Sequence, residues 1–318
     1  MTLYGHPIAR QLETWWREHG GRHDDAAWQA YIADLRSTLP AKLDEISAEH
    51  INGDGASKRF GMSKAGGCTR AAALKYLGHE GDPFTGSTLV TFHIGHLLEC
   101  MAIASLRACG YAVDGAQAAV TIDPFMHSYS DGIIADLDGR PAILSVKTAG
   151  YKKSGKQGAK WVRQGFPALP FEGVYAGQPS WWAQVQAEMY GTGIDQALVL
   201  VAAKDMVKAM EGDPYMGDEG NGSLSWYAEV VPYDPAFCKD QLLPVWQQTW
   251  DSVTDGKAGQ PFVWHAESRR YRQLTSPGDT KSGWGGPNRD VTGTFNPCFG
   301  CDFATACVQQ AANDYRRR

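Results

Sequence analysis

The 318-residue chain has no apolar run that approaches the roughly 20 residues of a membrane-spanning helix. Its first residues carry no secretory-signal pattern, and it has no internal repeat or low-complexity tract. The seven cysteines are odd in number, and three of them crowd near the C-terminus. These absences argue against a membrane protein and against an exported disulfide scaffold, and they favour the reducing cytoplasm.

The chain also lacks a large excess of either charge, since 30 basic and 35 acidic residues give a formal net charge of only −5. Such a balance argues mildly against a protein that coats nucleic acid, but it is compatible with a local basic groove. A content of 43% hydrophobic and 20% charged residues is that of an ordinary soluble protein. The length allows a full core, in one large domain or two.

The segment YSDGIIADLDGRPAILSVKTAG predicts two strands joined by a tight turn. The strands are expected at residues 129–135 and 141–148, and Asp138-Gly139 between them is a strong hairpin-turn signal.

Side chains that can carry chemistry lie on both strands of this hairpin. Ser145 and Lys147 point to the same side of the second strand, and Asp131 lies on the first. An acidic residue on one strand beside an acid-x-lysine sequence on the next is a pattern used for metal-dependent phosphodiester cleavage. In that pattern two carboxylates hold Mg²⁺ or Mn²⁺, and the lysine orients water. Here Ser145 stands where the second carboxylate is expected. The plainer alternatives are an edge-strand lysine and an aspartate beside a turn.

Five segments in this order resemble one nuclease family. The chain is similar to the PD-(D/E)XK nuclease superfamily, and within it to the RecB-like branch that carries an iron–sulfur cluster. The segments run from about residue 60 to residue 318 and are MSKAGGCTRAAALKYLG, FHIGHLLE, the hairpin, QAEMY and CFGCDFATAC.

The resemblance implies an α/β fold with a central mixed β-sheet flanked by helices, a restriction-endonuclease-like core. We expect a helical N-terminal extension over residues 1–60, with breaks at Pro40 and near residues 53–55, and a nuclease domain over residues 61–318 that ends in the cysteine cluster. Residues 88–108 are expected to form a helix whose core-facing stripe is Ile94, Leu97, Leu98 and Met101.

The resemblance also implies roles for residues on two helices. His96, Asp131 and the Val146 carbonyl would hold a divalent ion, and Glu99 matches an acid of phage-type exonucleases. A merely solvated helix face would look the same at His96 and Glu99. Gln186 and Tyr190 would hold the scissile strand or the catalytic lysine, with simple helix packing as the alternative for Tyr190. Glu188 is expected to face solvent.

Cys298-x2-Cys301-x5-Cys307 has the spacing of a metal-binding group. Three thiolates leave a fourth ligand to be supplied, and Cys68 is the best candidate. Four cysteines suit either Zn²⁺ or a [4Fe–4S] cluster, and the resemblance favours the cluster.

A run of basic residues follows the second strand of the hairpin, with no acid among them. It reads as a mobile loop at the mouth of the site, where phosphates and unpaired bases would bind. A solvated loop without function is the alternative. The DNA-contact candidates are Lys152, Lys153, Lys156, Lys160 and Arg163.

Together these features predict a Mg²⁺- or Mn²⁺-dependent DNA exonuclease acting on single-stranded or free ends, in a bacterial or phage-infected cell. Phage recombination and CRISPR adaptation, with a partner protein, are the contexts that the resemblance implies. The main alternative is a DNA-binding or assembly protein whose site has decayed; a zinc-stabilised scaffold is a third. Ser145 would reflect an engineered change, natural decay, or compensation by Glu99, and a weakened site is the leading expectation.

Overall fold

The computed structural model describes residues 5–52, 59–81, 85–115, 118–157, 160–165, 169–203, 226–265, 269–273, 303 and 306–307. Cys298 and Cys301 of the predicted cluster lie outside these residues. For residues 151–157 and 160–165 only the backbone is described, so the side chains of the predicted DNA-contact residues lie outside the description as well.

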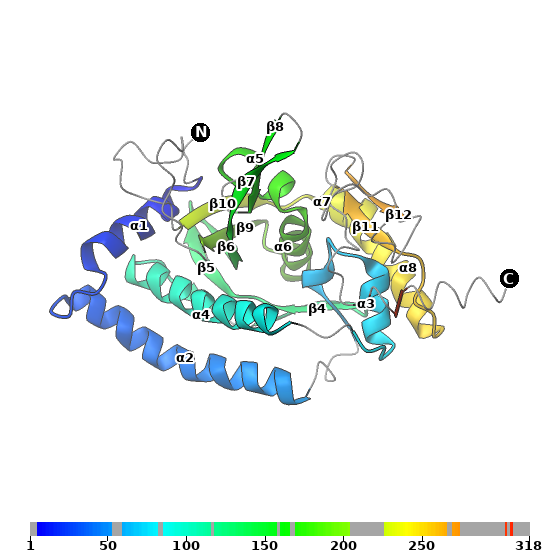
Figure 1. Ribbon diagram of the computed structural model, residues 1–318, viewed down its shortest axis with the longest axis horizontal. Coiled ribbons are helices and arrows are strands. Elements are labelled where there is room, and N and C mark those ends of the chain that lie inside the picture. Colours follow the sequence, from blue (N-terminus) through cyan, green and yellow to red (C-terminus); the bar gives the residue numbers. More distant parts are fainter. Residues whose placement is uncertain are drawn as a thin grey trace.

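A five-stranded mixed sheet forms the centre of the molecule (Figure 1). Its order is β10 (Trp226–Pro232), β9 (Gln196–Ala203), β6 (Arg140–Ala149), β5 (Gly132–Leu137) and β2 (Val113–Asp114). β6 and β9 pair in parallel, while the other neighbours are antiparallel. The apolar run of β9 is buried along nearly its whole length because helices cover both faces. The predicted mixed sheet flanked by helices is confirmed.

The predicted hairpin is formed by β5 and β6. Asp138 and Gly139 both have positive φ, 54° and 84°, as a tight turn between twisted strands requires. The first strand begins later than predicted, at Gly132, because residues 126–129 form β4 of a separate sheet with β1 (Phe60–Gly61) and β3 (Ala119–Ile122).

Helices pack on both faces of the central sheet. α6 (Pro179–Thr192) lies against the face that carries Ile143 and Val199. α1 (Pro7–His19) and α4 (Gly86–Ala108) cover the opposite face, where Leu144 and Leu198 are buried. α2 (Ala26–Asn52) packs along α4.

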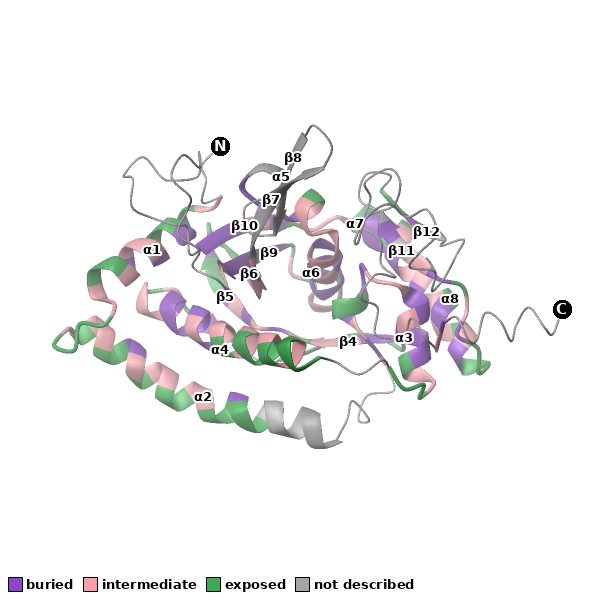
Figure 2. Cartoon of the chain, in the orientation of Figure 1, coloured by how far each residue is buried: buried purple, intermediate pink, exposed green. Residues whose placement is uncertain are grey.

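The expected core stripe of α4 is only partly correct. Ile94 and Leu97 are 39% and 41% exposed, whereas the fully packed part is the C-terminal half around Ala102 and Leu106 (Figure 2). The buried residues of α4 all lie in this half, whereas several apolar residues of the first half are exposed. By length and composition alone α4 could also cross a membrane, a test that the core helix of a soluble protein passes as well.

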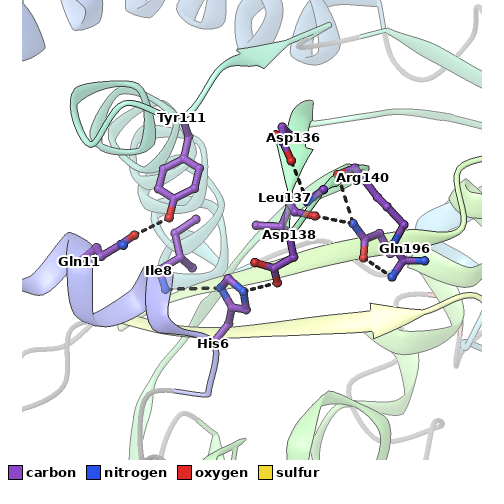
Figure 3. A network of polar contacts seen from close by, with 10 residues as sticks. His6, Ile8, Gln11, Tyr111, Asp136, Leu137, Asp138, Arg140 and Gln196 are labelled. Carbon is purple, nitrogen blue, oxygen red and sulfur yellow. Dashed lines mark hydrogen bonds and ion pairs between the residues drawn. The ribbon is translucent and has the colours of Figure 1, made fainter.

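The N-terminal helices are attached closely to the sheet. Gly5 bridges Ala228 of β10, and His6 contacts Asp138 in the hairpin turn at 3.0 Å (Figure 3). Tyr111 donates a hydrogen bond to Gln11 of α1.

The predicted break at Pro40 is wrong, because α2 continues through this exposed proline.

The remaining elements build the rest of the chain around this centre. The predicted basic loop is instead a two-stranded hairpin of β7 and β8. The bounds are η1 (Met62–Lys64), α3 (Thr69–Tyr76), β7 (Tyr151–Gln157), β8 (Lys160–Gly165), α5 (Leu169–Gly177), α7 (Pro235–Phe237), η3 (Cys238–Leu242), α8 (Leu243–Thr254), β11 (Phe262–His265) and β12 (Arg270–Gln273).

We expect Leu12→Ala in α1 to destabilise the whole protein. Leu12 is fully buried against the sheet, so its truncation leaves a cavity and costs about 2–5 kcal/mol of unfolding free energy. Exposed Glu18→Ala on the same helix is the control and should cost less than about 0.5 kcal/mol. Equal denaturant midpoints for both variants would show that α1 is a dispensable extension.

Candidate functional site

Asp131 and Lys147 come together at the end of the hairpin. Asp131 directly precedes β5, and its Oδ2 accepts a hydrogen bond of 2.7 Å from the backbone N–H of Val146. The antiparallel register pairs Gly132 with Leu144, which sets Asp131 opposite Ser145. The structure thus brings together the acid and the acid-x-lysine positions that the sequence predicted.

Lys147 points toward α6. Its Nζ donates to Oε1 of Gln184 at 3.0 Å, and Nε2 of Gln184 donates to Oε1 of Glu188 at 2.8 Å. Ser128 of β4 donates a second hydrogen bond, of 3.0 Å, to the same oxygen of Glu188. A polar chain therefore runs from the lysine across Gln184 to a carboxylate one helical turn further on.

The expectation that Glu188 faces solvent is wrong. Its exposed fraction is 2%, because α6 turns Gln184 and Glu188 together toward the sheet. Their spacing of i and i+4 puts them on one helix face, which is a signal that the sequence contained.

Gln186 and Tyr190 lie on another side of α6. The Gln186 amide donates to the carbonyl of Pro232 at 2.8 Å and accepts from the N–H of Asp234 at 2.7 Å. Its side chain is fully buried in these contacts, whereas Tyr190 is 42% exposed. The hold on Lys147 that we expected of this pair is made by Gln184, and a contact of Tyr190 with a DNA strand stays a prediction.

Glu99 is paired with a residue from the N-terminal helices. Lys42 of α2 lies 3.1 Å from its Oε1, and His96 lies 3.9 Å from its Oε2. Burial alone would raise the pKa of Glu99, but His96 and Lys42 together lower it below the usual value. Glu99 is therefore a charged carboxylate that already has a cationic partner.

Ser145 is buried between the sheet and α6. Its exposed fraction is 1%, and its Oγ has no hydrogen-bond partner among the residues that the structure describes. A buried hydroxyl without a partner is uncommon and often marks a place where a ligand or water binds.

The carboxylates around Asp131 shift its ionisation. Loss of hydration, together with the nearby carboxylates of Glu99 and Glu188, raises the pKa of Asp131 to about 7 against the attraction of Lys147. Burial also raises the pKa of Glu188, again opposed by Lys147. The positive charge of Lys147 is thus too small to keep the pKa values of both Asp131 and Glu188 at their usual level.

A hard divalent cation fits this donor set, which consists of carboxylate oxygens and backbone. Among the residues that the structure describes, no three His, Cys, Asp or Glu side chains group closely enough to hold a metal ion. The described side chains would therefore contribute two ligands at most, and the Val146 carbonyl, water and substrate would add to the coordination. The assignment of His96 and Val146 as ligands stays a prediction.

Two of the four cluster cysteines are described. Cys68 is the N-cap residue of α3, and its sulfur makes no capping hydrogen bond. Cys307 is buried in the core that α3 and α6 share. A helix N-terminus favours the thiolate that a cluster requires, so Cys68 suits the predicted role.

A comparison with known protein families finds no match, and neither does one with curated proteins. Solved structures are weakly similar in fold. LHK-Exo, an alkaline exonuclease from Laribacter hongkongensis, is 9% identical with a TM-score of 0.37, covering 63% of this chain and 89% of that one. LHK-Exo in complex with dAMP is 10% identical with a TM-score of 0.36, over the same shares of each chain, 63% and 89%. SSO0001 is 12% identical with a TM-score of 0.34, covering 63% of this chain and 81% of that one. Similarity at this level supports no statement about activity.

We expect Asp131→Asn to stabilise the protein at alkaline pH. With a pKa of about 7, the folded state keeps a proton that the unfolded chain releases above about pH 4. Native stability therefore falls as the pH rises from about 4 to about 7, and asparagine, which does not ionise, avoids this loss. Denaturant unfolding should show a gain of about 4 kcal/mol at pH 8, from about three pKa units at about 1.4 kcal/mol each, that shrinks toward zero near pH 4. A gain independent of pH would contradict the raised pKa.

Proposed function

We propose that the chain is a metal-dependent DNA nuclease whose active site lies between the β5–β6 hairpin and α6. The observation that supports this most is that Asp131 and Lys147 lie together beside Glu188, a buried acid with no cation within 4 Å among the described residues. Perturbed carboxylates next to a fixed lysine are typical of a catalytic site.

In this proposal each residue has a physical task. A divalent ion would supply the positive charge that offsets the attacked phosphate. Asp131 would hold that ion, with the Val146 N–H fixing the orientation of its carboxylate. Gln184 would keep the Lys147 ammonium directed into the site, where it positions water for in-line attack on phosphorus.

The finer assignments extend the same proposal. The substrate would be single-stranded DNA or DNA with free ends, cut as an exonuclease cuts it, in the cytoplasm of a bacterial or phage-infected cell. Recombination or CRISPR adaptation, with a partner protein, would be the setting. The β7–β8 hairpin follows Lys147 directly in the chain, so its basic residues would reach the phosphates of the bound strand.

The second candidate is a DNA-binding or assembly protein that keeps the fold without cleavage. Ser145 in the acid position favours it, because a hydroxyl adds no negative charge to a divalent-cation site.

We expect cleavage of end-labelled DNA that requires Mg²⁺ or Mn²⁺ and is abolished by EDTA. Lys147→Met should lower the rate by about 100-fold or more, because it removes the group that orients water. Exposed Lys257→Met is the control for a lost surface charge and should cut normally. Single-stranded and duplex DNA labelled at either end would reveal strand preference and polarity. DNA binding without cleavage at any metal concentration would favour the second candidate.

We expect protein purified without oxygen to be brown, with broad absorbance at about 400 nm from an iron–sulfur cluster. Replacing any one of four cysteines by serine should cause aggregation, because metal ligation by their thiolates contributes folding free energy. These cysteines are Cys68, Cys298, Cys301 and Cys307. Cys109→Ser, a cysteine outside this group, should leave the colour unchanged. Stoichiometric zinc without iron would replace the cluster with a structural zinc site.

A further inference from the structure

Ser145 leaves the proposed metal site one carboxylate short, and α6 offers a replacement. Ser145 lies across from Asp131 and two residues before Lys147, whose side chain reaches α6. Its own side chain therefore shares the α6 side of β6. The unpartnered Oγ, buried to 1% exposure, points into that space, and a polar atom left unsatisfied there indicates a place for a ligand.

Glu188 of α6 lies near the same groups, close enough to raise the pKa of Asp131 and to be attracted by Lys147. Gln184 connects it to Lys147, with hydrogen bonds of 2.8 Å to the Glu188 carboxylate and 3.0 Å to the lysine. The bonds from Gln184 and Ser128 both end on Oε1 of Glu188. They fix the orientation of the carboxylate, and Oε2 has no hydrogen-bond partner in the described part of the chain.

The charge of Glu188 is not compensated at close range. Among the described residues no Lys, Arg or His lies within 4 Å of its carboxylate, and Lys147 attracts it only from further away. Burying a carboxylate without an ion pair costs several kcal/mol. A divalent cation between Glu188 and Asp131 would supply the missing positive charge.

Glu99 differs from Glu188 in this respect. Its carboxylate and the Lys42 ammonium form a contact of 3.1 Å with exposed fractions of 14% and 8%. Recruiting Glu99 to a metal would break this largely buried pair and leave Lys42 without its counter-charge. Glu99 thus remains near Asp131 as part of an existing ion pair.

We propose that Glu188 supplies the second carboxylate of the divalent-cation site, together with Asp131, in the position that Ser145 leaves open. The acid would thus come from the helix rather than from the strand. The proposal rests on the metal-dependent activity inferred above. Two carboxylates would be the side-chain ligands, and Mg²⁺ commonly retains several waters in such sites.

Calorimetric titration with Mn²⁺, without DNA, tests this assignment. Glu188→Gln keeps the size of the side chain and should weaken Mn²⁺ binding about tenfold or more. Adding Ser145→Glu to that variant should restore the affinity to within about threefold of the unmodified chain. Glu229→Gln is the matched control, since Glu229 also accepts two hydrogen bonds on one carboxylate oxygen but is half-buried and lies on β10. The Mn²⁺ affinity of this variant should not change.

The outcomes separate this inference from the function on which it rests. If the unmodified chain binds Mn²⁺ and Glu188→Gln binds it equally well, Glu188 is not a ligand although the metal dependence stands. Loss of binding in Glu99→Gln alone would assign the ligand to Glu99. If the unmodified chain binds no Mn²⁺, both proposals fail.

If Glu188→Gln does not fold, a second measurement still tests the assignment. Ser145→Glu in the otherwise unmodified chain adds an acid to a space that Glu188 already occupies. We expect a lower melting temperature without added metal and no tightening of Mn²⁺ binding. Binding tightened about tenfold would show that the space at Ser145 lacked its acid, which would overturn the assignment to Glu188.

Discussion

The charges buried between β6 and α6 are the constraint on which this region depends. Glu188 is buried and Asp131 and Lys147 are half-buried, so the free energy of each charge depends strongly on the others. One ammonium cannot neutralise two carboxylates. The arrangement is therefore stable when a bound proton or cation neutralises the remaining negative charge. This excess of negative charge is why the region favours a cation.

The fold holds these groups on rigid elements. β6 and β9 pair in parallel along seven residues, and α6 belongs to the connection between them, packed on the sheet. Because Asp131 directly precedes β5 and Lys147 lies on the neighbouring β6, their relative positions follow from strand register. The contact of His6 with the Asp138 turn secures the other end of the hairpin. A site on such elements is placed more accurately than a site on loops.

Much of the fold could be predicted from the chain. β9 begins and ends where its apolar run does, and the Asp138-Gly139 turn follows from the positive φ that these residues tolerate. The two faces of α6 could not be assigned, since apolar residues occur all round it and it packs against both the sheet and η3. For that reason the motif-based choice of Gln186 missed Gln184, and Glu188 was placed in solvent.

A crystal grown with Mn²⁺ at pH 8 would test the central claim most directly. The account predicts one strong anomalous peak between the Asp131 and Glu188 carboxylates, about 2.0–2.4 Å from an oxygen of each, with the Lys42–Glu99 pair intact. A peak bound to Glu99 with Lys42 displaced, or full occupancy elsewhere while Glu188 stays bonded only to Gln184 and Ser128, would contradict it.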